Sequence, residues 1–248
     1  MVHVPPRLPG TASNVDGSYF KRAGDDLTPL ADHELRAMFA ETGPDFSAQP
    51  CPGATLTDLE PESIALFRER WARKSGDLRK RELNDQQTLR DAELLVEGDQ
   101  VSYAALILFG TRAGLTRWLA QAELVFEYRS SEAAGPAADR EEYRAGFFAW
   151  QDALWKKINL RNDRQSYQDD FFRMDLPTFD EVPVREAILN ALAHRDYRLG
   201  GSIFVRQFAK RLEVVSPGGL PPGITPENII DQQYPRNRRL AEALGRCG

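Results

Sequence analysis

The sequence contains little cysteine and histidine, and it lacks a long hydrophobic run. It has two cysteines and three histidines in 248 residues, and Cys51 and Cys247 lie far apart with no CxxC pair or Cys/His cluster. This pattern excludes a disulfide framework and a structural zinc site, and it fits a reducing compartment. The longest uncharged apolar stretch, residues 101–110, is about half as long as a membrane helix, and the first ten residues lack the apolar core of a signal peptide. We therefore expect a cytoplasmic protein without a membrane-spanning segment.

The chain also lacks an excess of positive charge. It has 32 Lys and Arg against 37 Asp and Glu, a net charge of −5, which excludes a general attraction to polyphosphate. Contact with DNA would therefore need a local basic segment. Residues 67–82 contain one, with seven basic and three acidic side chains; the basic ones are Arg68, Arg70, Arg73, Lys74, Arg79, Lys80 and Arg81. The alternative is an ordinary solvated helix and connector.

The proportions of apolar and charged residues, 42% and 28%, are those of a soluble globular protein with one or two hydrophobic cores. Near the N-terminus, residues 2–4 and 18–22 are predicted to be strands. The Asp16-Gly17 pair favours a tight turn before the second strand, because glycine tolerates positive φ. Residues 32–41 are predicted to form a short helix.

The middle of the chain has the periodicity of helices and then of a strand. Pro61 favours the first turn of a helix in which Ile64, Phe67 and Trp71 share one face. A second helix is predicted over residues 87–96, before the apolar run ALILFG. Residues 124–128 have the pattern of a strand.

A domain boundary is predicted after residue 130. The small and polar residues 130–139 are typical of a surface loop or linker. From Glu141 onward we expect a long helix with one apolar face, formed by Tyr143, Phe147, Trp150, Leu154 and Ile158. Core packing explains these aromatic residues better than a cofactor cage does.

The segment from residue 183 to residue 219 combines a helix, two strands and a glycine turn. Pro183 can begin a helix, with a core stripe formed by Val184, Ile188, Ala191 and Leu192. A polar row on another side contains Glu186, Asn190 and His194. Strands are predicted at residues 202–208 and 211–215. The turn that follows, Ser216-Pro217-Gly218-Gly219, lets the backbone approach a ligand without side-chain obstruction.

The strings REAILNALAHRDY, RLEVVSPGGLPPGI and YPRNRRLAEAL resemble the histidine-kinase-like ATP-binding domain of bacterial AlbA/Schlafen-type transcriptional regulators, a domain related to the RecG helicase C-terminus. The segment GSYFKRAG resembles the end of a Schlafen-type AlbA domain. The resemblance implies an α+β fold in which helices of the Bergerat type cover a sheet. It divides the chain into a C-terminal remnant of the AlbA domain (1–52), a mixed α/β connecting region (53–130) and a histidine-kinase-like ATPase domain, incomplete at its C-terminus (131–248).

The resemblance also implies a site for ATP and magnesium. In this superfamily a helix with the pattern Glu-x-x-x-Asn supplies the general base and an amide ligand of Mg²⁺, and Glu186 and Asn190 occupy those positions. One helical turn separates them, so both can reach the same phosphates. The resemblance adds these residues to the cofactor site: His194, Ser216, Gly218, Gly219, Arg236 and Asn237.

Several of these residues also have a structural explanation. From spacing alone, Glu186 and Asn190 fit a solvated helix face, and Pro-Gly-Gly is a generic turn. His194 fits a packed helix end, and Arg195 and Asp196 are expected to fix the connection from helix to strand. For Arg236 and Asn237 the role is either structural or phosphate-facing.

Two departures from the superfamily pattern weaken the expected activity. Ser216 and Pro217 precede the glycines where the superfamily has an Asp that accepts a hydrogen bond from adenine. The glycine-rich lid over the phosphates has no counterpart before Gly248. We therefore expect an internal fragment or truncated product of a longer regulator, with weak or lost nucleotide binding and at most a weak ATPase activity.

Three functions fit these observations. The first is an ATP- and Mg-binding module of a DNA-associated transcriptional regulator. The second is a catalytically inert scaffold or homodimerisation module. The third is nucleic-acid processing through the AlbA portion, which is the least supported because the acidic residues that it needs are not present.

Overall fold

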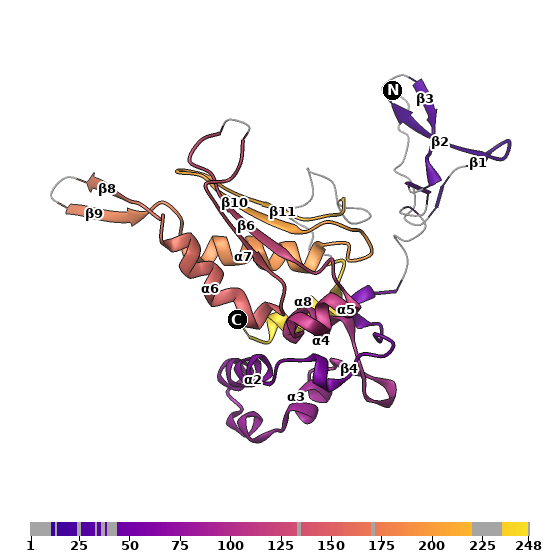
Figure 1. Ribbon diagram of the computed structural model, residues 1–248, viewed down its shortest axis with the longest axis horizontal. Helices are drawn as coiled ribbons and strands as arrows, with labels where there is room; N and C mark the ends of the chain where they lie inside the picture. The colour runs from indigo at the N-terminus through magenta and orange to yellow at the C-terminus, as the bar shows by residue number, and fades with distance from the viewer. Residues whose placement is uncertain are drawn as a thin grey trace. The chain divides into compact units, whose positions relative to one another are not determined.

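The computed structural model describes residues 11–12, 14–23, 26–32, 34–35, 38, 44–132, 135–169, 172–219 and 235–247. The fold is α+β, as the sequence predicts (Figure 1). Two compact units are present. One comprises Met1–Pro44 and Leu220–Tyr234, and the other comprises Asp45–Gly219 and Pro235–Gly248. Within the described part of the chain, no helix is long and apolar enough to cross a membrane.

The first unit contains a three-stranded antiparallel sheet in the order β1-β2-β3, formed by β1 (Asn14–Val15), β2 (Ser18–Ala23) and β3 (Asp26–Pro29). Asp16 and Gly17 have φ values of 49° and 82°, which confirms the predicted turn. The strand predicted at 18–22 is confirmed as β2. In the helix predicted at 32–41, the described positions 32, 34, 35 and 38 are helical. The strand predicted at 2–4 lies outside the described residues.

The second unit contains the remaining helices and strands. Its α-helices are α2 (Pro61–Ser75), α3 (Asp85–Asp91), α4 (Tyr103–Phe109), α5 (Arg112–Trp118), α6 (Phe147–Asn159), α7 (Glu181–His194) and α8 (Arg238–Gly245). Short 3-10 helices are η1 (Phe46–Ala48), η2 (Leu56–Asp58), η3 (Leu78–Glu82) and η4 (Glu97–Asp99). Its strands are β4 (Leu95–Val96), β5 (Gln100–Val101), β6 (Leu124–Tyr128), β7 (Asp139–Tyr143), β8 (Arg164–Asp169), β9 (Phe172–Pro177), β10 (Ile203–Gln207) and β11 (Leu212–Val215).

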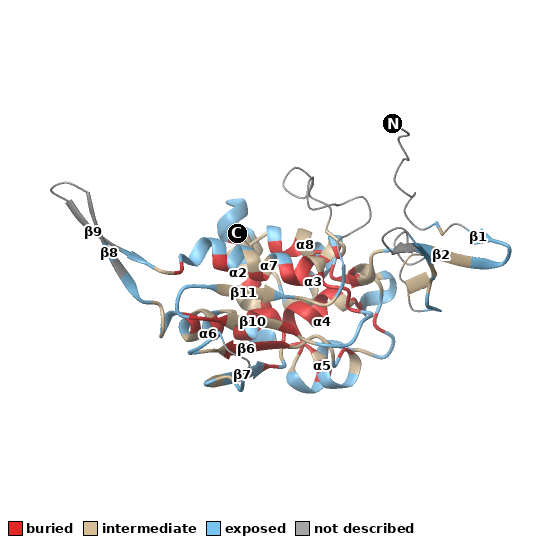
Figure 2. Cartoon of the chain, turned by 90° about the horizontal axis from the view of Figure 1, so that it is seen from above, coloured by how far each residue is buried: buried red, intermediate tan, exposed pale blue. Residues whose placement is uncertain are grey.

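Helix α4 lies at the centre of the core. The Ser102 side chain accepts a hydrogen bond from the backbone N–H of Ala105 at 3.2 Å and begins the helix. Residues 104–109 are all buried, as expected for a helix that is apolar all round (Figure 2). The Phe67 ring of α2 packs edge-on against Phe109 and Phe148, with ring centroids 5.4 and 5.7 Å apart. Pro61 occupies the first turn of α2, as predicted.

One four-stranded sheet supports the candidate site. Its order is β11-β10-β6-β7, with β6 and β10 parallel and the two outer pairs antiparallel. Helices α6 and α7 lie along one face of it (Figure 1). On β10 the side chains of Ile203, Val205 and Gln207 are buried, and Gln207 Nε2 donates to the Ile158 carbonyl of α6 at 3.0 Å. The strands predicted at 124–128, 202–208 and 211–215 are confirmed as β6, β10 and β11.

The predicted long helix from Glu141 begins later than expected. Residues 139–143 form β7 and pair with β6, so Glu141 and Tyr143 belong to the sheet. Helix α6 begins at Phe147, after Gly146. A Cβ atom at Gly146 would lie 2.6 Å from the Leu108 carbonyl oxygen, so this close approach to the end of α4 requires glycine. From Phe147 onward the predicted apolar face is confirmed by the buried Trp150, Leu154 and Ile158.

The helix predicted at 87–96 is displaced toward the N-terminus. Asn84 and Gln87 form a capping box that begins α3 at Asp85. Glu93 has a φ of 59°, which is incompatible with continuing a right-handed helix. Residues 95–96 then pair with residues 100–101 as β4 and β5.

The predicted boundary after residue 130 also differs from the structure. The residues between β6 and β7 connect neighbouring strands of one sheet, and residues 45–219 belong to one compact unit. Their small and polar composition therefore reflects a hairpin connection. The predicted boundary after residue 52 lies within the same unit, where Cys51 N–H donates to the Val101 carbonyl at 2.8 Å.

Helix α8 is joined to the beginning of the same unit. Its N-terminal amides at Arg239 and Leu240 donate to Asp45 Oδ2 at 2.7 Å and Ser47 Oγ at 3.2 Å. These two acceptors supply the N-terminal cap that the helix lacks locally, since Asn237 makes no side-chain cap. Leu240 and Leu244 are buried against the core.

Candidate functional site

Helix α7 presents the predicted polar row on its surface. The Asp180 side chain accepts from the Val182 N–H at 2.9 Å and begins the helix, so α7 starts two residues before the predicted Pro183. The predicted stripe of Val184, Ile188, Ala191 and Leu192 is buried. Glu186 and Asn190 are exposed. Among the described residues, neither side chain makes a hydrogen bond or an ion pair, so both side chains remain available to a ligand.

The C-terminal end of α7 is held by Asn237. This side chain is fully buried, and its Nδ2 donates to the carbonyls of Ala193 at 3.0 Å and Arg195 at 2.7 Å. Its backbone N–H donates to Ala193 at 3.0 Å as well. The last carbonyls of a helix have no partner within the helix, so Asn237 supplies one from a segment that follows the sheet. The role of Asn237 in the described chain is therefore structural.

Arg236 connects the end of α7 to the glycine turn. Its Nε lies 3.3 Å from the His194 carbonyl, and its Nη2 donates to the Gly219 carbonyl at 3.1 Å. Its Nη1 lies 3.5 Å from Asp196 Oδ2. Burial, together with the positive charge of Arg236, lowers the pKa of His194, so the half-buried imidazole is neutral at pH 7.

Asp196 fixes the other side of the glycine turn. Its N–H donates to the Pro217 carbonyl at 2.9 Å. Burial alone would raise the pKa of Asp196, but the hydrogen bonds from Arg198 and the charge of Arg236 outweigh this effect and lower it. Gly218 has a φ of 116°, and a Cβ atom there would lie 3.2 Å from Asp196 Cβ. The positive φ and this close contact explain why the turn has glycine at position 218.

Arg195 holds the loop between α7 and β10 from inside. The residue is fully buried, and its Nη2 donates to the carbonyls of Gln121 at 2.8 Å and Gly201 at 2.7 Å. Its guanidinium carbon lies 5.1 Å from the centroid of the Tyr197 ring. Arg195 and Asp196 therefore fix the helix-to-strand connection, as the sequence suggested.

The structure brings together only some of the predicted site residues. Arg236 links His194 to Gly219, while Gly218 and Asn237 contact the loop that Arg195 and Asp196 form. Glu186, Asn190 and the half-buried Ser216 make no hydrogen bond to this cluster. The sequence indicated Asp196 only as a connector, and its contact with Arg236 across 40 positions has no local sequence signal.

The basic segment at 68–81 is largely neutralised by neighbours. Arg68 pairs with Asp85 at 2.9 Å, Arg79 with Asp77 at 3.0 Å and Arg81 with Glu69 at 2.5 Å. The other four also have partners: Arg70 contacts Gln151 and Asp152, Arg73 contacts Glu69, Lys74 contacts the Gly245 carbonyl and Lys80 contacts Asp77. The segment therefore offers a weaker positive field than its residue count indicates.

Comparison with known proteins relates this architecture to two families. Residues 200–248 match the family described as "Putative ATP-dependent DNA helicase recG C-terminal". Residues 36–125 match a family described as a domain of unknown function, DUF8451. Over 94% of its length the chain is similar to a crystal structure of the DIP2311 protein from Corynebacterium diphtheriae, with 28% identity and a TM-score of 0.67. The chain spans 45% of that protein's length. None of the curated proteins matches the chain.

The match at residues 200–248 indicates an ATP-binding or DNA-helicase-related module at the C-terminal side. The glycine turn, Arg236 and Asn237 lie inside the matched residues 200–248, whereas Glu186 and Asn190 precede them. Neither family description names the Schlafen-type AlbA domain that the N-terminal residues were predicted to resemble.

We predict that Asn237→Ala lowers the free energy of unfolding by about 1–3 kcal/mol, because it leaves the Arg195 carbonyl without this donor, while the Ala193 carbonyl keeps the backbone N–H of residue 237. Asn190→Ala, an exposed change on α7, should alter stability by less than about 0.5 kcal/mol. Urea unfolding followed by circular dichroism measures both. Equal stabilities for the two variants would show that Asn237 does not hold the end of α7.

The two glycines of the turn provide a second matched pair. Gly218→Ala should cost about 1–3 kcal/mol, because alanine disfavours the positive φ and approaches Asp196. At Gly219 a Cβ atom meets nothing within 4 Å, so Gly219→Ala should be tolerated. Thermal unfolding of both variants tests this difference, and a Gly219→Ala variant as unstable as Gly218→Ala would contradict it.

Proposed function

We propose that the second unit is a nucleotide-binding module in which α7 binds the magnesium complex of ATP. The observation that carries this proposal is the pair Glu186 and Asn190. They lie one turn apart on an exposed face, free of partners in the described chain, on a helix whose C-terminal end is held by residues matched to an ATPase-like family.

The side chains present fit the chemistry of the cofactor. The amide oxygen of Asn190 is a hard neutral ligand of the kind that Mg²⁺ accepts beside phosphate oxygens. The Glu186 carboxylate is exposed and can accept a proton from water at the same end. When bound, Mg²⁺ would neutralise charge on the phosphates. Ser216, at the start of the glycine turn, would provide a hydroxyl for the base end of the nucleotide.

Each residue of the proposed site would have a separate role in binding or hydrolysis. Asn190 positions the metal complex, and Glu186 orients a water and holds its proton. His194 is neutral and sits where α7 meets Arg236, so it contributes shape and a hydrogen-bonding nitrogen rather than charge. Arg236 and Asn237 hold the end of the helix, and the Arg236 guanidinium adds positive potential close to the turn.

Two substitutions separate binding from hydrolysis. Asn190→Ala should weaken Mg-ATP binding about tenfold, a loss of about 1.4 kcal/mol. Glu186→Gln should keep the affinity within about twofold but lower turnover by about 10²-fold or more, as expected when a general base is removed. Isothermal titration calorimetry with Mg-ATP and a phosphate-release assay measure the two effects.

Glu62→Gln, an exposed change in the first turn of α2, is the matched control and should alter neither quantity. If the parent protein binds no Mg-ATP at millimolar concentration, the nucleotide proposal fails. The inert scaffold or homodimerisation module is then the function to pursue. Equal turnover in the Glu186→Gln variant and the parent would remove Glu186 from the reaction.

We also propose that the module belongs to a DNA-associated regulator and that α2 and η3 contact DNA. The Arg73 and Arg79 side chains keep 72% and 88% of their surface exposed despite their ion pairs. Exposed pairs of this kind contribute little and can be exchanged for phosphate contacts. The contacts would be salt-sensitive and independent of base sequence.

The double variant Arg79→Gln/Arg81→Gln should bind duplex DNA more weakly and lower the slope of log affinity against log salt by up to about 2. Arg112→Gln, a change at an exposed residue of α5, is the control and should behave like the parent. Fluorescence anisotropy at two or more salt concentrations gives the slopes. An absence of binding by the parent even at low salt would exclude DNA contact through this segment.

A further inference from the structure

A groove on the other flank of α7 has the features of a small-molecule site. It lies between α2, α6 and α7 and has a volume of about 310 Å³, which falls within the range of ligand pockets. Its floor is apolar and almost completely buried; it is formed by Phe147, Trp150, Leu154, Val184 and Ile188. Trp155 and Cys247 form parts of the wall. Burial raises the pKa of the Cys247 thiol to about 12, so the wall carries no charge there.

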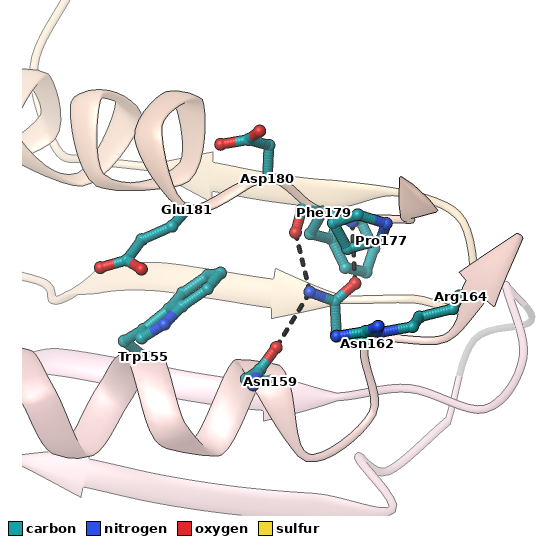
Figure 3. A pocket seen from close by; sticks show the side chains of 8 residues that line it. All are labelled: Trp155, Asn159, Asn162, Arg164, Pro177, Phe179, Asp180 and Glu181. Carbon is teal, nitrogen blue, oxygen red and sulfur yellow. Dashed lines mark hydrogen bonds between the residues drawn. The ribbon is translucent and has the colours of Figure 1, made fainter. Parts of the chain in front are cut away.

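A second hollow adjoins this groove at the base of the β8–β9 hairpin. It has a volume of about 450 Å³ and shares Trp155 and Glu181 with the groove. Figure 3 shows Trp155 of α6 and Glu181 of α7 on facing sides, with Asp180 directed away. Asn162, at the other end, exchanges hydrogen bonds with the backbone of Phe179 at 2.7 and 2.8 Å. The Asn162 side-chain amide is therefore already occupied and is not free to bind a ligand in the second hollow. For this reason we place the ligand in the apolar groove.

Gln151 is one of the residues that line the groove, and its amide N–H group has no acceptor. Its Oε1 accepts from Arg70 Nη1 at 2.8 Å, but its Nε2 is buried and has no partner. A buried donor without a partner costs free energy, which a ligand acceptor would recover. The ligand should therefore carry an oxygen or ring nitrogen near Gln151.

The free charges around the groove favour an anion. Arg185 is exposed and makes no ion pair with any described residue. Arg73 lies 3.9 Å from Glu69, which already pairs with Arg81 at 2.5 Å, so the charge of Arg73 is only partly compensated. Arg70 and Asp152 lie 3.5 Å apart and neutralise one another. Glu181 is the one acidic side chain of the described groove lining that lacks an ion pair. The unpaired Arg185 and the partly compensated Arg73 thus outweigh the single Glu181 carboxylate.

From this combination we infer that the groove binds a small planar aromatic anion. The aromatic part lies on the apolar floor against Trp155, an acceptor atom meets Gln151, and the carboxylate, sulfonate or phosphate meets Arg185 at the mouth. This site uses a flank of α7 that carries Val184, Arg185 and Ile188, whereas the proposed nucleotide site uses Glu186 and Asn190. A ligand here would contact α7, the same helix that carries the proposed nucleotide site.

The test uses 2-naphthoate as the probe and its neutral amide, 2-naphthamide, as the uncharged comparison, with ligand-observed NMR titrations of the full chain. We expect saturable naphthoate binding and about tenfold weaker binding of the amide, which lacks the charge. Arg185→Glu should weaken naphthoate binding about tenfold, and Glu181→Gln should tighten it about threefold, because each changes the local charge in a known direction.

Three controls locate the effect. Arg112→Glu reverses an exposed charge on α5, outside the groove, and should leave the affinity within about twofold of the parent. Trp155→Ala removes part of the wall and should weaken binding, with circular dichroism confirming the fold. Asn190→Ala should leave naphthoate binding unchanged, so failure of this site and failure of the nucleotide site give different results. Equal effects of Arg185→Glu and Arg112→Glu, or the absence of saturable binding, would overturn the inference.

Discussion

Asn237 donates two side-chain hydrogen bonds to the carbonyls that end α7, and the arrangement of the candidate site depends on them. These bonds are made from a fully buried amide, where a donor without competition from water is worth more than at the surface. The adjacent Arg236 uses the same position to reach the His194 and Gly219 carbonyls and the Asp196 carboxylate. One dipeptide thus joins the helix end, the connecting loop and the glycine turn.

The position of the Arg236-Asn237 dipeptide is fixed by residues that lie far from it in the sequence. Helix α8 follows Asn237 directly, and its first amides are capped by Asp45 and Ser47. Residues 45–125 and 235–247, which are parts of the two matched segments, therefore meet within one compact unit. Helix α7 is held at its C-terminal end by the second segment, while its buried stripe packs into the core that the first segment shares. Glu186 and Asn190 are left exposed, and their side chains make no hydrogen bond or ion pair within the described chain.

Local patterns predicted the elements whose signals are local. Strand β6 and the stripe of α7 follow from alternation and from helical periodicity, and the turn at Asp16-Gly17 follows from the φ preference of glycine. The beginning of α6 did not follow. Tyr143 extends the apparent apolar face of the helix toward the N-terminus, and only the pairing of residues 139–143 with β6 makes them a strand. The end of α3 depends on the positive φ of Glu93, which its side chain does not indicate.

In the candidate site too, some residues could be predicted from the sequence, whereas others depend on contacts between distant segments. The family resemblance pointed to Glu186, Asn190 and the glycine turn, and residue types alone suggested a role for Arg195 and Asp196 in the connection. The structural role of Asn237 required the fold, because its acceptors lie 42 and 44 positions away. The groove beside α6 could not be predicted, since it is assembled from α2, α6 and α7 and its key feature is an unpartnered Gln151 amide. Amide hydrogen exchange with and without Mg-ATP tests the central claim, that the held end of α7 positions a nucleotide-binding face, most directly. We expect slow exchange at residues 191–196 in the free protein and further protection of residues 184–196 with Mg-ATP. Rapid exchange at the helix end, or no protection there by the nucleotide, would show that the held end of α7 does not position a nucleotide-binding face.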